Sequence, residues 1–382
     1  MTLLLIIIYI VFISLGLPDS LYGAAWPVMH KSLNLPESTA AVFSVIVAMS
    51  TASMGFFSGK IIRKHGTAKT TAYSIVLTII GILGISFANN ALGLIPFSII
   101  LGLGAGAIDT TLNNFVSLHY KSNHMNWLHA FWGLGITTGP IILSIFLKDG
   151  NWRSGYRVVA IIQSLICLLV FLSLDKWKIV NEKTTNNPTK KQSKNIDVFG
   201  TPGLLPSILS LGMYCALEAI PITWGASYLV HINKLTPDVA ARWSSLFLAG
   251  IMAGRVVAGF VSEKLKDVKM IKLGSLIQLF GILVIMIFGG NATTIGLFML
   301  GFGCGPIFPS VLHYIPDRFG TELSADITGY HMGSAYFIAF STQLLFGFIA
   351  TKTSFIIMPY VLAVLCVMFI FLNIKVNKIT LK

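Results

Sequence analysis

Charged side chains are scarce in this chain, and acidic ones are the scarcest. Asp and Glu together number 14 of 382 residues, against 27 Lys and Arg, and charged residues make up 11% of a sequence that is 55% hydrophobic. A water-soluble domain carries about 25% charged residues, so this composition excludes one. Apolar runs of about 20 residues, enough to cross a bilayer as a helix, recur along nearly the whole sequence. We therefore expect an all-α membrane protein whose main partner is the lipid bilayer.

The sequence also lacks the patterns of catalytic and cofactor sites. It has four cysteines, all within apolar runs and without metal-ligand spacing, which predicts buried core residues. No nucleophile elbow, metal-binding His/Glu pattern or phosphoryl-transfer motif is present. The net charge of +13 is not gathered into basic helices or aromatic-interleaved patches, so no nucleic-acid partner is expected. We therefore expect that the protein is not an enzyme and has no metal site or cofactor. The expected coupling ion is the proton.

The apolar runs predict twelve transmembrane helices. They cover residues 3–29, 37–59, 68–88, 91–118, 126–147, 154–174, 201–230, 238–262, 269–289, 292–315, 323–350 and 354–374. We expect the first run to be a span rather than a removable signal peptide. An even number of spans places both termini on one side. Lys and Arg are concentrated in the loops after the second and eighth spans and near the C-terminus, so the positive-inside rule predicts a multi-pass protein of the cytoplasmic membrane with both termini in the cytoplasm.

One polar stretch divides six spans from six. Residues 175–200 contain six lysines and the sequence Asn186-Asn187-Pro188, so we expect a cytoplasmic linker that is mobile or forms a helix lying on the membrane surface. The predicted domains are therefore an N-terminal six-helix bundle at 1–174, the linker at 175–200 and a C-terminal six-helix bundle at 201–382.

The two halves contain similar segments in the same order. Residues 55–60 resemble 259–264, residues 102–108 resemble 301–307, and 128–130 resemble 330–332. Three matches in one order indicate an internal repeat, so the two bundles should be pseudo-symmetric. The glycines of 102–106 permit close helix packing and do not form a nucleotide loop, because no strand precedes them and no Lys-Ser/Thr follows them.

Three acidic residues lie well inside predicted spans: Asp19, Asp109 and Glu218. A carboxylate at membrane depth is costly unless it is paired or hydrated, and burial favours its protonated form, so each can bind and release a proton. The alternative is that one or more of them only caps or hydrogen-bonds a neighbouring helix. For Asp19, which follows Pro18, the two interpretations are balanced; for the other two we favour function.

Polar and aromatic residues near these acids could hold a small polar ligand. Asn113 lies one helical turn after Asp109, Tyr22 and Trp26 follow the acid of the first span, and Trp224 follows the acid of the seventh. A carboxylate and an amide can bind neighbouring hydroxyls while an indole stacks on the face of a sugar ring. For Trp26, a place in the aromatic belt at the membrane interface is the alternative.

Two histidines and one arginine complete the candidates. His129 and His331 occupy corresponding spans, and each can relay a proton or satisfy a buried backbone group. For His129 the two alternatives are balanced. His331 has fewer acids near it in the sequence, so a structural role is favoured there. Trp132 follows on the same helix as His129. Arg255 lies deep in the eighth span, where we expect it to pair with an acid or to bind backbone carbonyl groups near the cytoplasmic end, as a gating or packing residue.

The six-plus-six plan and the repeated glycines resemble the major facilitator superfamily over essentially the whole chain. The basic segment 59–66, with Arg63, resembles that superfamily's signature between spans 2 and 3, a cytoplasmic latch, but lacks its usual acidic residue. Residues 16–23 (GLPDSLYG), 104–113 (GAGAIDTTLN) and 128–135 (LHAFWGLG) resemble the branch near the fucose–proton symporters and related sugar porters.

The resemblance implies roles for individual residues. It implies that the acids of spans 1 and 4, Asp19 and Asp109, take part in proton coupling and sugar binding. His129 stands in the neighbourhood where the symporters carry an asparagine. Glu218 with Trp224 resembles a pattern in span 7 of other relatives of this branch.

The sequence thus predicts a monomeric secondary transporter that moves a small polar solute, with a sugar favoured, coupled to protons by alternating access. Asp109 and Glu218 are the expected protonation or ligand sites. One alternative is a proton-coupled exporter of drugs or lipophilic cations, in which the acids bind the cation and Phe and Met residues line the pocket. Another is a membrane receptor that senses a sugar without transporting it, which a soluble module would support.

Overall fold

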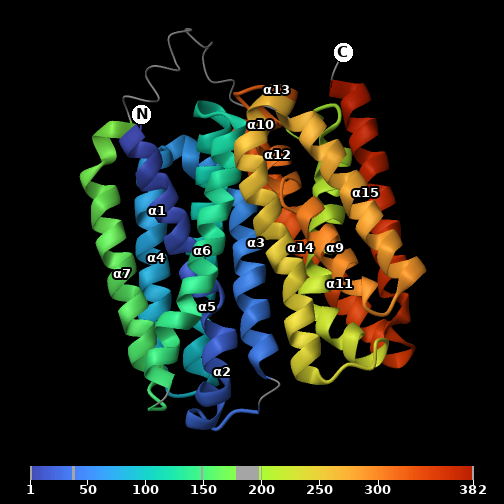
Figure 1. Cartoon of the computed structure of the whole chain (residues 1–382). Helices are drawn as coiled ribbons and strands as arrows, with labels where there is room; N and C mark the ends of the chain where they lie inside the picture. The colour runs from blue at the N-terminus through green and yellow to red at the C-terminus, as the bar shows by residue number, and fades with distance from the viewer. Residues whose placement is uncertain (1, 37–38, 148, 178–197, 199, 381–382) are drawn as a thin grey trace. The chain divides into compact units, whose positions relative to one another are not determined.

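The computed structural model describes residues 2–36, 39–147, 149–177, 198 and 200–380, and this part of the chain is almost entirely helical (Figure 1). Its helices are α1 (Thr2–Asp19), α2 (Leu21–Ser32), α3 (Ala40–His65), α4 (Thr67–Phe87), α5 (Ala91–His119), α6 (Ser122–Leu147), α7 (Trp152–Leu172), α9 (Leu204–His231), α10 (Pro237–Phe288), α11 (Ala292–Cys304), α12 (Ile307–His313), α13 (Ile315–Phe319), α14 (Ser324–Lys352), the 3-10 helix η2 (Phe355–Ile357) and α15 (Met358–Thr380).

The described residues account for the twelve predicted spans. Among these residues, eleven helical stretches are long and apolar enough to cross a membrane, and one of them, Arg242–Phe288 in α10, has 47 residues. A single crossing needs about 20 residues, so this stretch is long enough for two. The backbone of α10 leaves the helical region at Lys266, with φ 61° and ψ 162°, and this break divides it into two spans. The all-α, twelve-span prediction is confirmed.

Two predicted spans contain an interruption, and the second span ends later than predicted. The first span is interrupted at Ser20, after Pro18, and the tenth at Gly305 and Pro306. The basic segment 59–66 is not a loop, because α3 continues to His65 and turns only at Gly66, where φ is 77°. Basic side chains in the last turn of a helix offset the partial negative charge of its free carbonyl groups, which explains why the segment extends the helix.

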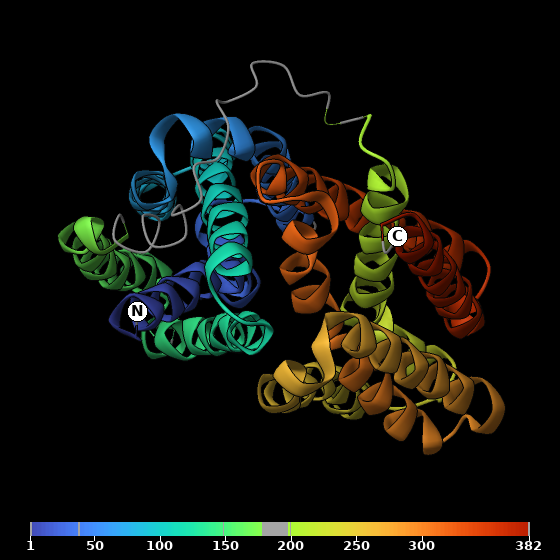
Figure 2. The same cartoon turned by 90° about the horizontal axis from the view of Figure 1, so that it is seen from above.

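The chain forms two compact units, one of residues 1–119 and 128–196 and the other of residues 120–127 and 197–382. In unit 1, α5 packs against α3 and α4, and α7 packs against α4. In unit 2, α9 packs against α14 and α15, and α10 packs against α11, as the view along the helices shows (Figure 2). Most of the predicted linker, 178–197 and 199, lies outside the described residues. The first residues of the linker, which the structure describes, belong to unit 1. There Trp177 is buried, and its ring centroid lies 5.0 Å from that of Phe115.

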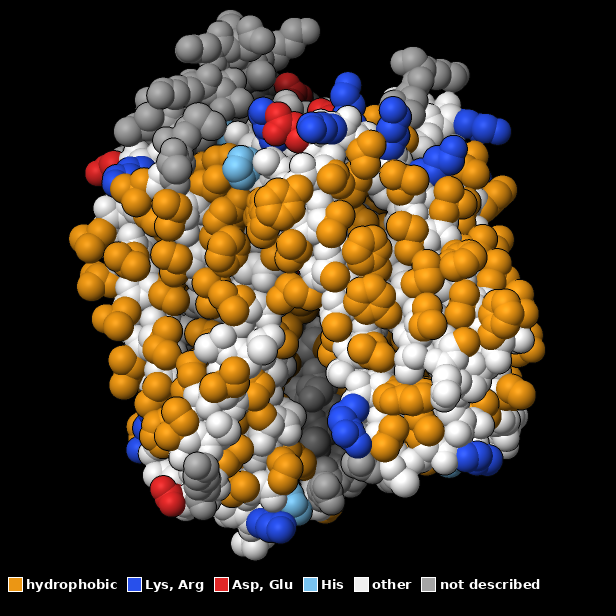
Figure 3. Space-filling view, viewed as in Figure 1, with side chains coloured by type: hydrophobic (Ala, Val, Ile, Leu, Met, Phe, Trp, Pro, Cys, Tyr) orange, Lys and Arg blue, Asp and Glu red, His pale blue; other side chains and the backbone are white. Residues whose placement is uncertain are grey.

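Large apolar side chains cover most of the face seen in Figure 3. On α7 alone, Leu165, Leu168, Leu169 and Leu172 are each at least 47% exposed. An apolar surface of this extent is unstable in water and is the surface that lipid tails cover. The chain is a multi-pass membrane protein.

The repeated glycines are contact points between helix backbones in both units. A Cβ atom at Gly102 would lie 2.4 Å from the carbonyl oxygen of Val47 on α3, and one at Gly104 would lie 2.8 Å from that of Ser74 on α4. In unit 2, a Cβ at Gly301 would lie 2.0 Å from the carbonyl oxygen of Phe247, in the first part of α10. One at Gly303 would lie 2.5 Å from that of Gly274, in the second part. The two series serve the same purpose in corresponding helices, as the sequence repeat predicts.

Adding a single methyl group at one of these contacts should destabilise unit 1. We expect Gly102→Ala to lower the free energy of unfolding by about 1 to 3 kcal/mol, because the methyl group meets backbone that has no room to move. Thermal unfolding of the detergent-solubilised protein measures the change. The matched control is Gly23→Ala in α2, where nothing lies within 4 Å of the added Cβ and stability should stay equal or rise. Equal losses in both variants would contradict the contact.

Candidate functional site

Three of the predicted site residues are joined by hydrogen bonds in unit 1. The side-chain nitrogen of Asn113 donates to a carboxylate oxygen of Asp109 over 2.7 Å, and its side-chain oxygen lies 3.0 Å from Nε2 of His129. Because an amide oxygen only accepts, Nε2 of the histidine must carry a hydrogen in this arrangement. The carboxylate and the imidazole are thus connected and oriented by one amide group.

The position of this network follows from local sequence. Asp109 and Asn113 are four residues apart on α5 and therefore lie on the same face, one turn from each other. His129 comes from α6, and the ring of Phe12 on α1 meets its ring edge-on at 5.5 Å. All three members of the network are buried, with Asp109 only 6% exposed. A carboxyl group this well sealed keeps its hydrogen-bond partners and is not freely hydrated.

A second carboxyl group, that of Asp19, is more open. It lies at the end of α1, where the indole N–H of Trp132 on α6 donates to it over 2.9 Å. The side chain of Asp19 is exposed, unlike that of Asp109, and the two carboxyl groups are close enough to interact electrostatically. Close approach of the two helices depends on Gly16, where a Cβ would lie 2.3 Å from the carbonyl oxygen of Trp132. Unit 1 therefore presents one accessible and one sealed acid.

Tyr22 and Trp26 lie in the hydrophobic core of unit 1, away from open space. The hydroxyl of Tyr22 is hydrogen-bonded to Ser98 over 2.7 Å, and its ring stacks on Phe43 at 5.9 Å. The indole of Trp26 packs 5.7 Å from the same phenylalanine, and both residues are buried. Their contacts are those of packing residues.

In unit 2, the buried acid and the buried arginine are paired. Nη2 of Arg255 on α10 lies 3.7 Å from Oε1 of Glu218 on α9, and the two side chains are 6% and 16% exposed. The residue four positions before the acid, Tyr214, donates from its hydroxyl to the carbonyl oxygen of Cys304 over 2.9 Å. A Cβ at Gly305 would lie 2.7 Å from the backbone nitrogen of Arg255, so the arginine's helix also contacts the end of α11 closely.

Trp224 is held by a residue that the sequence did not single out. Its indole N–H donates to the carbonyl oxygen of Gln343 over 3.0 Å, and the hydroxyl of Thr223 donates to that residue's side-chain oxygen over 2.8 Å. The indole ring also packs 5.9 Å from Phe355. The only signal for Gln343 in the sequence is an amide within the apolar run of α14.

The remaining two candidates have other surroundings. His331 is fully buried; its Nδ1 donates to the carbonyl oxygen of Ile327 over 2.8 Å, and its Nε2 lies 2.8 Å from the hydroxyl of Ser207. A neutral imidazole satisfies both contacts, since the hydroxyl can donate, and this is a structural arrangement. Arg63 is exposed in the last turn of α3.

Within the described ranges, no group of three or more His, Cys, Asp or Glu side chains is placed to hold a metal ion. What the two units offer instead is protonatable and hydrogen-bonding chemistry. Unit 1 has two carboxyl groups, an amide and an imidazole, and unit 2 has a carboxylate that neutralises a buried guanidinium.

Comparisons with known proteins agree with this architecture. The profile of the Major Facilitator Superfamily matches residues 8–350. The glucose/mannose transporter GlcP of Bacillus subtilis is 23% identical over 394 residues, covering 97% of this chain and 94% of its own. Among solved structures, FucP in its outward conformation has a TM-score of 0.81 at 13% identity, covering 98% of both chains. The proton:xylose symporter XylE has a TM-score of 0.79 at 10% identity, covering 98% of this chain and 94% of its own.

The match to the superfamily profile extends over most of the chain, and the similarity to GlcP spans nearly all of it. The two solved structures share the same helical fold. The chain therefore belongs to the Major Facilitator Superfamily, as its sequence resemblance implied, and is a membrane transporter rather than an enzyme.

Proposed function

We propose that this transporter moves a sugar across the membrane together with protons, by alternating access. The observation that carries the proposal is the hydrogen-bonded network of Asp109, Asn113 and His129, with the accessible Asp19 beside it. Carboxylate and amide groups are the side chains that bind sugar hydroxyls. Support comes from GlcP, a glucose/mannose transporter, from FucP, a fucose:proton symporter of E. coli, and from XylE, a proton:xylose symporter.

The network suggests how a proton and a sugar act on the same group. An ionised Asp109 accepts a hydrogen bond from the amide of Asn113 and holds it in place. A proton added to the carboxyl group weakens this bond, since charge-assisted hydrogen bonds are about twice as strong as neutral ones. The amide is then able to turn to a sugar hydroxyl. Binding of the proton and of the sugar would therefore favour each other, which is the requirement of symport.

Uptake into proteoliposomes tests the proposal directly. Purified protein is reconstituted, a pH gradient is imposed with the acidic side outside, and labelled glucose, mannose, fucose and xylose are supplied in turn. We expect at least one sugar to accumulate above its external concentration, and a protonophore to abolish the accumulation. Protein-free liposomes are the control. If no sugar moves under any gradient, the sugar assignment is wrong although the family assignment stands.

We also propose that the protein acts as a monomer in the cytoplasmic membrane, with both termini in the cytoplasm. The support for this orientation is the concentration of Lys and Arg at the ends of the second and eighth spans and near the C-terminus. Epitope tags at the two ends of the chain should both be protected from protease in intact cells. A tag that is cleaved from outside would contradict this orientation.

A further inference from the structure

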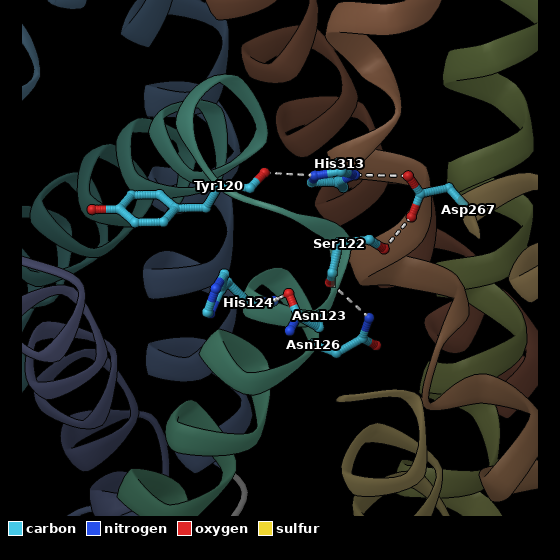
Figure 4. Close-up of polar contacts among 7 residues, drawn as sticks. All are labelled: Tyr120, Ser122, Asn123, His124, Asn126, Asp267 and His313. Carbon is cyan, nitrogen blue, oxygen red and sulfur yellow. Dashed lines mark hydrogen bonds and ion pairs between the residues drawn. The ribbon is translucent and has the colours of Figure 1, made fainter. Parts of the chain in front are cut away.

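The turn that joins α5 to α6 belongs to unit 2, although both helices otherwise belong to unit 1. Residues 120–127 group with residues 197–382, so the chain enters unit 2 for eight residues and returns. Three kinds of contact hold this docked segment, residues 120–127. The hydroxyl of Ser122 donates to Oδ1 of Asp267 (Figure 4), Lys121 forms an ion pair with Glu263, and the ring of Trp127 meets that of Phe260 edge-on at 5.2 Å.

The centre of the docking site is His313, at the end of α12. Its Nδ1 lies 2.7 Å from Oδ2 of Asp267, and its Nε2 lies 2.9 Å from the backbone carbonyl oxygen of Tyr120. Figure 4 shows the side chain of Tyr120 pointing away, so the docked segment is held there by its backbone. The histidine thus bridges α10 and this carbonyl group.

Both partners of His313 are acceptors, and this fixes its charge in the docked state. A carboxylate oxygen and a carbonyl oxygen each need an N–H, whereas a neutral imidazole has only one. With the Asp267 carboxyl group ionised, both contacts are satisfied together only when the ring carries two protons and a positive charge. His331 differs, because one of its partners is the hydroxyl of Ser207, which can donate to a neutral ring.

The surrounding charges favour the same state. Asp267 receives Ser122 on one oxygen and His313 on the other, as an ionised carboxylate does, and it is 7% exposed. The other titratable or charged groups around the histidine come from the docked segment, α10, α12–α13 and the residue between them. They are Lys121, His124, Glu263, Tyr314, Asp317 and Arg318. Lys121 and Glu263 neutralise each other, so the Asp267 carboxylate remains the direct counter-charge of His313.

We propose that the docked segment is a proton-operated latch: protonated His313 ties it to Asp267, and loss of that proton releases it. A histidine changes charge between about pH 5 and 8, so the latch responds within the physiological range. Below that range both contacts form, and above it one N–H and the ionic attraction to Asp267 are lost. The latch itself does not depend on the sugar assignment, but its role in transport rests on the proposed function. The helices that the segment joins carry Asp109 and His129, so the latch would make their movement depend on the proton concentration at this turn.

Thiol labelling of the docked segment tests the latch without any substrate. Met125 is fully buried, so a Met125→Cys variant reports release as faster reaction with a methanethiosulfonate reagent. The labelling rate of purified Met125→Cys is measured between pH 5.5 and 8.5. At each pH it is divided by the labelling rate of the double variant Met125→Cys/His313→Gln. This ratio cancels the intrinsic pH dependence of the thiol, and the parent without Met125→Cys corrects for the four native cysteines.

With His313 present, we expect the labelling rate to rise about tenfold more across this range than with His313→Gln, which is the effect of losing one charge-assisted hydrogen bond. Asp267→Asn should remove the pH dependence as well, and His313→Lys, which stays charged, should give a flat response. The proposal would be overturned if all variants showed the same pH dependence, or if Met125→Cys with His313 intact showed none. If labelling depends on pH as expected but no sugar is transported, only the sugar assignment is contradicted. If a sugar is transported but labelling does not depend on pH, only the latch is contradicted.

Discussion

Sugar uptake driven by a pH gradient should fall by about 100-fold when Asp109 is replaced by Asn, since the network loses both its proton acceptor and a charge-assisted hydrogen bond. The substituted amide keeps the shape of the side chain but cannot take up a proton, and it no longer offers Asn113 a charged acceptor. Proteoliposome uptake of the sugar found in the panel measures the loss.

The control for this variant is Asp149→Asn, the same chemical change in an exposed turn between α6 and α7. It should transport like the parent. Exchange of labelled for unlabelled sugar without a gradient then separates two outcomes, because a variant that exchanges but does not accumulate has lost coupling alone. Normal accumulation by Asp109→Asn would remove this residue from the coupling mechanism.

Replacing Glu218 by Gln should lower the free energy of unfolding by about 3 to 5 kcal/mol, because it removes the carboxylate charge that faces the buried guanidinium of Arg255. The same substitution at Glu322, which is exposed in the turn before α14, should change stability little. Thermal unfolding in detergent compares the two variants.

A double variant shows whether the loss of stability comes from removing the counter-charge of Arg255. Glu218→Gln combined with Arg255→Gln removes both charges and should recover most of the stability, as buried pairs replaced by neutral residues often do. If the two losses simply add, the residues do not interact and the 3.7 Å separation has no energetic meaning. Transport by the double variant separates stability from function, because a stable but inactive protein would give the pair a role in the transport cycle.

The sequence predicted the spans and the relation between Asp109 and Asn113 because both are local patterns. A run of about 20 apolar residues and a four-residue spacing are properties of one helix. The close helix contacts at the glycines were also predictable, since small residues in an apolar helix predict close contact with a neighbour. The helix breaks at Ser20 and Lys266 were harder to predict, because a single non-helical residue hardly changes the hydrophobic pattern around it.

Contacts between residues that lie far apart in the chain could not be predicted from the sequence. An acid was expected for Arg255, but nothing local distinguished Glu218 from the other acids as the one it pairs with. Gln343 was missed because its partner Trp224 is on another helix, 119 residues away. The basic segment ending at His65 predicts a loop, because charged residues in a hydrophobic sequence are typical of loops, whereas here they extend a helix.

The docking of residues 120–127 on unit 2 also bears on how the chain is made. His313 follows Trp127 by 186 residues, so its codon is read long after α5 and α6 have left the ribosome. At about 5 to 20 residues per second, this delay is about 10 to 40 s. During that time the turn has none of its final contacts with Asp267 and His313, and the ring of Trp127 has yet to meet Phe260. Completion of the α5–α6 turn must therefore be a late, post-insertion step, which takes place only after most of the second half has been synthesised.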